Sequence, residues 1–249
     1  MKKAIIFLLV LITLIFPLTV RAEKTGEEKA MLDSKDVDLN VLPLNLKESN
    51  GEKIVLLRDL GEIYEWNFSY NSEKKEVTIY NKSGSYSFKI TEFLLDDPNI
   101  SENKKTPIIR EGRTYINLDL INPLLAKLNE MKAHLVTNLE VESEVIRSGQ
   151  DFKSWIEVYN ISDENLRLHF SSGQLYDLYL RKENELIWQW SDDKYFTMAI
   201  QYKELAAGDE LIYEETVPGI NGPGEYVFTG EIKTQKTLPL AELMLKVIK

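Results

Sequence analysis

The chain has 249 residues, of which 43% are hydrophobic and 28% charged, and its formal net charge is −10 at pH 7. This length suits two small domains, and the apolar content excludes a wholly disordered chain. The absence of cysteine excludes thiol catalysis, disulfides and iron–sulfur ligation. The acidic charge, with no basic run, argues against a nucleic-acid partner. The two histidines, His134 and His169, are both expected to be exposed to solvent.

Residues 1–22 have the features of a signal peptide. Two lysines precede an apolar stretch over 4–18, which is too short to span a bilayer comfortably. Small residues at the −3 and −1 positions predict cleavage after Ala22. We therefore expect an extracytoplasmic protein, secreted or associated with the cell envelope, with no integral membrane span after cleavage. The alternative is an uncleaved N-terminal anchor.

Residues 23–38 are charged and poorly patterned, and we expect them to form a mobile leader. Residues 39–131 then alternate between strand and helix spacing, which predicts a small α+β domain. Strands are expected at 41–46, 66–68, 76–80, 86–90, 106–109 and 115–117, and helices at 55–64 and 118–128.

Several short motifs stand out in this first domain, namely Leu56–Gly61, Trp66, Lys74–Ile79 and Gly112–Leu118. Together they resemble the copper amine oxidase-like N-terminal domain. The resemblance implies a non-catalytic accessory module in which a sheet packs around a helix. A copper amine oxidase centre needs three His ligands and a modified Tyr, which the two histidines of this chain do not supply. We expect no copper, no other metal and no cofactor.

Residues 132–137 are expected to link the two domains. Residues 138–249 show strands at regular intervals without a helical pattern, which favours an immunoglobulin-like antiparallel sandwich. The predicted fold is therefore mixed: a small α+β N-terminal domain followed by an all-β sandwich. In a predicted hairpin, Trp188 and Trp190 point to the same face. That face is expected to belong to the sandwich core, and the alternative is an aromatic binding surface.

Separated motifs recur in order through the second domain: Ser172–Gln174, Tyr176–Asp177, Leu186, Trp188–Ser191, Phe196, 205–210, 213–215 and Gly222–Gly230. Over residues 138–235 they resemble the BsuPI family, known as intracellular proteinase inhibitors. The resemblance implies inhibition of a serine protease by a β-sandwich domain. Because this chain is expected to be exported, an extracytoplasmic serine protease or another envelope protein is the expected partner.

Two loops of the sandwich suit an inhibitor, which holds an extended segment rigidly in the cleft of its target. One, at 191–196, combines an aromatic pair with charged residues. In the other, at 217–223, prolines restrict the backbone and Ile220 is expected at the tip. The candidate partner-binding residues are Asp192, Asp193, Tyr195, Phe196, Pro218, Ile220 and Pro223. The alternative for both loops is an ordinary connection between strands.

The sequence offers no catalytic motif: it has no nucleophile elbow, phosphate-binding loop or metal-ligand cluster. The adjacent carboxylates Asp96–Asp97 and Asp192–Asp193 point apart on an extended chain, although a distant carboxylate pair stays open as an alternative. We expect a non-enzymatic exported bacterial protein that binds a protein partner, as a serine proteinase inhibitor. The alternative is an envelope or cell-wall scaffold or attachment protein without inhibitory activity.

Overall fold

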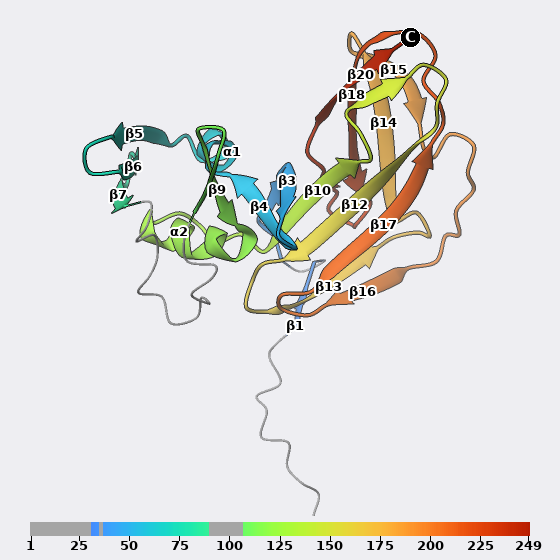
Figure 1. Ribbon diagram of the computed structural model, residues 1–249. Coiled ribbons are helices and arrows are strands. Elements are labelled where there is room, and N and C mark those ends of the chain that lie inside the picture. Colours follow the sequence, from blue (N-terminus) through green and yellow to red (C-terminus); the bar gives the residue numbers. More distant parts are fainter. Residues whose placement is uncertain (1–30, 35–36, 90–106) are drawn as a thin grey trace, which may run out of the picture.

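The computed structural model describes residues 31–34, 37–89 and 107–249. The predicted signal peptide, most of the leader and the Asp96–Asp97 pair lie outside these ranges. The described chain forms a small α+β part, which we call the N-terminal module (residues 46–128), and a larger β-sandwich (Figure 1).

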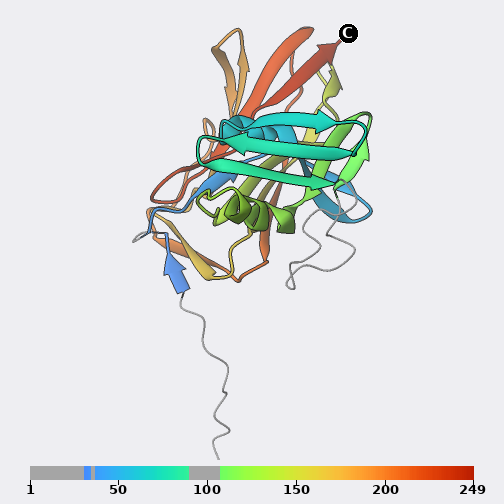
Figure 2. The same cartoon turned by 90° about the vertical axis from the view of Figure 1, so that its left-hand side faces the viewer.

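Two antiparallel sheets build the described part of the N-terminal module, in the strand orders β3-β4-β9-β8 and β5-β6-β7. Its strands are β3 (Leu46–Ser49), β4 (Glu52–Leu56), β5 (Asn67–Asn71), β6 (Glu76–Asn81), β7 (Gly84–Lys89), β8 (Ile108–Arg110) and β9 (Arg113–Asn117). Its helices are α1 (Leu57–Ile63) and α2 (Ile121–Lys127), the second preceded by a 3-10 turn, η2 (Leu118–Leu120). In Figure 2 the β5-β6-β7 layer lies in front of α1.

The core of the N-terminal module lies between its helices and sheets. Apolar residues at helical spacing bury one face of each helix, for example Leu57 and Leu60 in α1 and Leu124 in α2. They pack with Trp66, Ile79 and other buried apolar side chains. Burying a side chain of this size contributes about 1.5–3 kcal/mol, so the amphipathic helices are stabilised mainly by tertiary packing.

The sandwich contains three sheets, in the orders β17-β12-β10-β2, β11-β20-β18-β14-β15 and β1-β13-β16. The first strands are β1 (Met31–Asp33), β2 (Val41–Pro43), β10 (Leu135–Val141), β11 (Val145–Arg147), β12 (Phe152–Asn160) and β13 (Asn165–Phe170). The others are β14 (Tyr176–Lys182), β15 (Glu185–Gln189), β16 (Gln201–Leu205), β17 (Glu210–Val217), β18 (Gly224–Ile232), β19 (Leu238–Pro239) and β20 (Leu243–Ile248).

Alternating side chains of these strands fill the sandwich core. In β18, for example, Tyr226 and Phe228 are buried while Glu225 is exposed. Phe228 meets Phe152 of β12 edge to face, with ring centroids 5.8 Å apart. Period-two burial between facing sheets is the packing of an immunoglobulin-like sandwich. The predicted fold class is confirmed.

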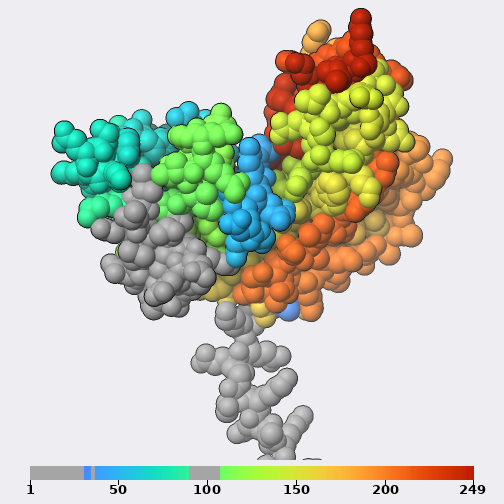
Figure 3. Space-filling model, viewed as in Figure 1, coloured from blue at the N-terminus to red at the C-terminus, as the bar shows by residue number. Residues whose placement is uncertain are grey.

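The N-terminal module is joined closely to the sandwich (Figure 3). Strand β2 pairs in parallel with β10, and the backbone N–H of Leu46 donates to Oδ1 of the buried Asn138 at 3.0 Å. Lys53 of the module lies 2.9 Å from the buried Glu157 carboxylate and 3.1 Å from Glu140. Strand β2 thus leads the chain from a sandwich sheet into the module, and a backbone hydrogen bond and an ion-pair cluster hold the two parts together.

Two segments that we expected to be irregular contain strands. Residues 135–137, in the expected linker, begin β10 and are buried between β2 and β12. In the expected mobile leader, β1 pairs with β13, and the backbone N–H of His169 donates to Ser34 Oγ at 2.9 Å. Strands as short as β1 show too few residues for their alternation to be seen in the sequence.

The expectation that both histidines are exposed is wrong. His169 is 6% exposed, because β13 is the central strand of its sheet, and its ring lies 4.9 Å from that of Tyr202. His134 is half-buried, and its Nδ1 accepts a hydrogen bond from the backbone N–H of Asn40 at 3.0 Å. Within the described ranges, no helix has the length and apolar character needed to cross a membrane.

Candidate partner-binding loop

The connection between β15 and β16, residues 190–200, has neither helix nor strand. We call it the display loop. It carries large apolar side chains that are turned outward: Tyr195 is 102% exposed, Met198 90% and Ile200 58%. Single exposed apolar residues are common on protein surfaces, but several on one loop are typical of a contact site for another protein.

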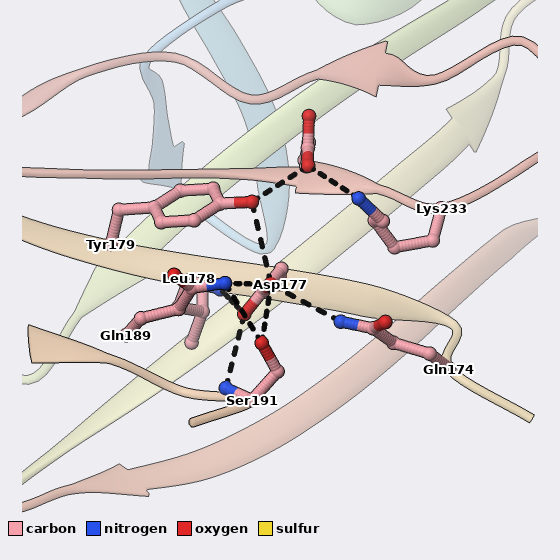
Figure 4. Close-up of polar contacts among 8 residues, drawn as sticks. Gln174, Asp177, Leu178, Tyr179, Gln189, Ser191 and Lys233 are labelled. Atoms are coloured by element: carbon pink, nitrogen blue, oxygen red, sulfur yellow. Dashed lines mark hydrogen bonds and ion pairs between the residues drawn. The ribbon is translucent and has the colours of Figure 1, made fainter. Parts of the chain in front are cut away.

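A buried carboxylate holds the start of this loop in place (Figure 4). Asp177 of β14 is 2% exposed. It accepts hydrogen bonds from the Ser191 hydroxyl at 2.7 Å and the Ser191 backbone N–H at 3.2 Å. The side-chain amides of Gln189 and Gln174 donate to it at 2.7 and 3.1 Å. Hydrogen bonds to a charged acceptor are stronger than neutral ones, so Asp177 fixes the chain where β15 ends.

The same carboxylate belongs to a wider polar cluster on this side of the sheet. The Tyr179 hydroxyl lies 3.4 Å from Asp177 and donates to Glu231 at 2.7 Å, and Lys233 lies 2.7 Å from Glu231. Burial acts to raise the pKa of Glu231, but the hydrogen bonds from Lys233 and Tyr179 lower it overall. Burial and the Glu231 hydrogen bond raise the pKa of Tyr179. These pKa shifts favour an ionised Glu231 carboxylate and a neutral Tyr179 phenol.

Stacked rings hold the middle of the display loop. The rings of Trp190 and Phe196 stack with centroids 5.7 Å apart, and Lys194 Nζ lies 4.7 Å from the Trp190 ring centroid. Trp190 in turn packs on Tyr176, with a centroid distance of 4.6 Å. Phe196 and Lys194 thus lie against the sandwich, and Tyr195 between them points into solvent.

A glycine holds the end of the loop. The Gly173 backbone N–H donates to the carbonyl oxygen of Thr197 at 2.8 Å. A Cβ atom on Gly173 would lie 2.6 Å from Thr197 Oγ1 and 3.3 Å from the Thr197 backbone nitrogen, so a side chain here would force the Thr197 hydroxyl or the loop to shift. The display loop is thus held on both sides of Tyr195, at Ser191 and at Thr197.

The structure brings four of the predicted site residues together on the display loop. Asp192, Asp193 and Tyr195 are exposed, whereas Phe196 is half-buried and supports the loop from below. Asp193 pairs with Lys194 at 3.4 Å; such exposed pairs contribute little stability. Met198 and Ile200 carry no signal as binding residues in the sequence, because single apolar residues look alike in loops and in strands.

The second predicted loop, at 217–223, is not arranged for display. Pro218 and Pro223 are exposed, but Ile220 is 4% exposed and belongs to the sandwich core. Its position at a loop tip was wrongly predicted. The loop packs onto the chain beside it, since Gly149 N–H donates to the Ile220 carbonyl oxygen at 2.8 Å. A branched apolar side chain on a proline-restricted loop is as well suited to filling the end of the core as to contacting a partner.

The two hairpin tryptophans lie at the border between the sandwich core and the surface. Trp188 and Trp190 are half-buried and pack against the core. Trp190 also forms the base of the display loop. In the described part of the chain, no three His, Cys, Asp or Glu side chains gather into a metal-binding group.

Three solved structures illustrate what the chain is similar to. A β-glucosidase from Erythrobacter marinus is 13% identical, with 45% of this chain and 15% of that one covered and a TM-score of 0.28. The CARDB domain of a Pyrococcus furiosus protein is 11% identical, with 46% and 87% covered and a TM-score of 0.29. The Bacillus subtilis sporulation control protein Spo0M is 12% identical, with 47% and 51% covered and a TM-score of 0.32. Similarity at this level carries no information on function.

No curated protein matches the chain. The resemblance of residues 39–131 to the copper amine oxidase-like N-terminal domain stays a prediction. The model of the BsuPI family, described as intracellular proteinase inhibitor, matches residues 139–237. This range contains the Asp177 cluster and the whole display loop. Residues 139–237 are therefore similar to the BsuPI family of intracellular proteinase inhibitors.

Proposed function

We propose that this protein is exported and inhibits an extracytoplasmic serine protease through the display loop. The BsuPI family is a family of proteinase inhibitors, which supports a protease as the class of partner. The features of residues 1–22 support export. The binding residues are Tyr195 and Met198, with Asp192 and Asp193 at the rim.

The observation that carries the proposal is the exposure of Tyr195 on a loop that is held on both sides. Ordering a flexible side chain or loop on binding costs about 0.5–1.5 kcal/mol for each immobilised side chain. Here Ser191 is hydrogen-bonded to Asp177 and Thr197 to Gly173 before any partner arrives. A loop fixed in this way loses little conformational entropy when it enters a protease cleft. If the protease cuts the loop, the anchors at Ser191 and Thr197 should hold the two new chain ends in place.

Tyr195 also indicates which proteases fit. It is a large, fully exposed aromatic side chain. We expect it to enter the protease pocket that receives the residue before the scissile bond. A hydrophobic slot accepts aromatic residues there, whereas an acidic pocket selects lysine or arginine. We expect a target protease that cleaves after aromatic residues.

The experiment uses residues 23–249 against two probe enzymes, chymotrypsin and trypsin. We expect the parent chain to inhibit chymotrypsin stoichiometrically. The Tyr195→Ala variant should bind chymotrypsin at least tenfold more weakly. Tyr80→Ala is the matched control, because Tyr80 is an exposed tyrosine (42%) in the N-terminal module, and it should inhibit like the parent chain. Cleavage of the display loop without inhibition would contradict the proposal.

A second candidate function is that of a non-inhibitory scaffold at the cell envelope. It is favoured by the close joint between the N-terminal module and the sandwich, where Leu46 N–H donates to Asn138 and Lys53 bridges to Glu157. Such a joint presents the display loop at a fixed orientation from the module. Retention on cell-wall fractions without any effect on proteolysis distinguishes this function from inhibition.

A further inference from the structure

A long depression runs beside β5 in the N-terminal module, distant in sequence from the display loop. It consists of two hollows of about 660 and 590 Å³ that share Arg58, Glu62 and Phe68. We call it the β5 trough. One hollow is lined by Tyr70 and the β8–β9 turn, and the other by Trp66 and Asn67. Each volume lies in the usual range for ligand sites.

The backbone edge of β5 forms one wall of the trough. Successive residues of β5, from Asn67 to Tyr70, line the two hollows. Neighbouring side chains on a strand point to opposite faces, so a hollow that lies on one face alone would be lined by every second residue. Lining by consecutive residues therefore indicates that the trough borders the backbone edge of β5. Within the described residues β5 pairs only with β6, and every residue of β5 is exposed. Its outer edge therefore presents unpaired N–H and C=O groups, a template for another strand.

The floor of the trough is apolar. Leu57 and Val77 lie at its base, and Tyr70 and Ile109 stand beside them, 58% and 50% exposed. Phe68 is fixed on α1, since a Cβ atom on Gly61 would lie 2.4 Å from its ring. An extended chain lying along β5 would place alternate side chains on this floor.

Opposite charges mark the two ends of the trough. Glu65 borders the hollow beside Asn67, and its 3.5 Å pair with Lys82 is so exposed that it is weak and exchangeable. Arg113 borders the hollow beside Tyr70. Asp59 lines the same hollow as Arg113, and burial, with the charge of Glu62, raises the pKa of its carboxyl group. The ends thus favour a basic side chain beside Glu65 and an acidic one beside Arg113.

We propose that the β5 trough binds an extended peptide segment of a partner protein, which adds as a strand to the free edge of β5. The peptide carries a basic residue, alternate apolar residues and an acidic residue, in the order that matches Glu65, the floor and Arg113. This mode takes its affinity from backbone hydrogen bonds and its specificity from alternate side-chain pockets.

The shape of the trough favours a single peptide strand over a second copy of this chain. Gly112, in the β8–β9 turn, and Arg113 and Thr114, at the start of β9, line the same hollow as Phe68–Tyr70 of β5. A second copy would bring its own β5 with β6 and β7 attached, and that sheet is wider than one strand, which needs only about 4.8 Å. The proposal does not depend on the display loop or on protease inhibition.

The test selects random heptapeptides displayed on phage with residues 23–249 as bait. Enriched peptides are expected to share the basic–apolar–acidic pattern. Synthetic peptides with the enriched sequences should bind the Tyr70→Asp variant at least tenfold more weakly than the parent chain. Tyr80→Asp is the matched control, because Tyr80 is exposed on the same sheet but follows the buried Ile79 and so points to its other face, and it should bind like the parent. The combined charge exchange Glu65→Arg with Arg113→Glu should reverse the order of charges in newly selected peptides.

Three results would overturn the proposal. The first is selection without any shared pattern. The second is equal peptide affinity of the Tyr70→Asp, charge-exchanged and parent chains. The third is self-association of the parent chain that Tyr70→Asp abolishes, which would make a second copy the occupant. A loss of protease inhibition has no bearing on these readouts, since the display loop is unchanged in all variants.

Discussion

The hydroxyl group of Ser191 donates a hydrogen bond to the buried carboxylate of Asp177 at 2.7 Å. This contact links the interior strand β14 to the first residues of an irregular loop whose most exposed side chain is Tyr195. The sandwich thus supplies the rigidity and the display loop supplies the contact surface. The arrangement follows a general pattern in which binding residues lie on loops positioned by a rigid scaffold.

Replacing Asp177 by alanine should release the start of the display loop. The donors on Ser191, Gln189 and Gln174 would lose their acceptor in a largely buried site, and each unsatisfied group costs about 1–3 kcal/mol unless water reaches it. We expect Asp177→Ala to lower the free energy of unfolding by about 2–3 kcal/mol in urea titrations. Asp192→Ala, one residue beyond the anchor and exposed, should change it by less than about 0.5 kcal/mol. Equal effects of the two variants would argue against the anchoring role.

Gly173→Ala tests the other end of the loop. The added Cβ atom would meet Thr197 Oγ1 at 2.6 Å and the Thr197 backbone nitrogen at 3.3 Å, so the Thr197 side chain must shift, and any accompanying backbone shift would lengthen the Gly173 N–H bond to Thr197. We expect faster hydrogen exchange at the residue 173 amide and weaker protease binding with little change in the sandwich. Gly84→Ala serves as control, because a Cβ atom there meets nothing within 4 Å. Unchanged exchange at residue 173 would show that the contact does not restrain the loop.

Lys53→Met should weaken the joint between the N-terminal module and the sandwich. It would leave the buried Glu157 carboxylate without its cation, and losing one partner of a buried pair costs about 3–5 kcal/mol. Since the Lys53 side chain keeps 21% exposure, we expect about 2–3 kcal/mol, at or below the low end of that range. Lys153→Met breaks an exposed pair with Glu214 and should cost less than about 1 kcal/mol. A similar small loss for both variants would contradict the structural role of the Lys53 cluster.

The same cluster predicts a pH dependence of stability. Burial acts to lower the pKa of Lys53, but its hydrogen bonds and charge interactions with Glu157 and Glu140 raise it above the ordinary value of 10.5. A raised pKa in the folded state gives a contribution that is complete below the unfolded pKa and is lost as pH rises through the folded pKa. The stability difference between the parent chain and Lys53→Met should therefore stay constant from about pH 7 to pH 10 and shrink above pH 10.5. Shrinkage below pH 9 would indicate another titrating group.

Much of the fold could be predicted from the sequence, because long strands show their alternation. Strands such as β12 and β18 have enough residues for period-two burial to appear in the sequence. Short strands do not: β1 has three residues, and its pairing with β13 depends on chain far away in sequence. The burial of His169 likewise follows from the strands on both sides of β13, which no local pattern contains.

The candidate site could be predicted only in part. Asp192 to Phe196 stood out because aromatic and charged residues are adjacent there. The separation of Tyr195 from Phe196, one exposed and one packed on Trp190, depends on the direction in which the loop folds back. The role of Asp177 was hidden because its donors come from residues 174, 189 and 191 on three different segments. Ile220 was misplaced because a core residue and a displayed one share the same apolar chemistry.

The measurement that tests the central claim most directly is a change of protease specificity by one substitution in the display loop. Tyr195→Arg keeps the anchors at Ser191 and Thr197 and alters only the side chain offered to the protease. We predict that it inhibits trypsin and loses at least tenfold in affinity for chymotrypsin, while the parent chain shows the opposite preference. If the preference of the parent chain and of Tyr195→Arg is the same, the display loop does not enter the active-site cleft.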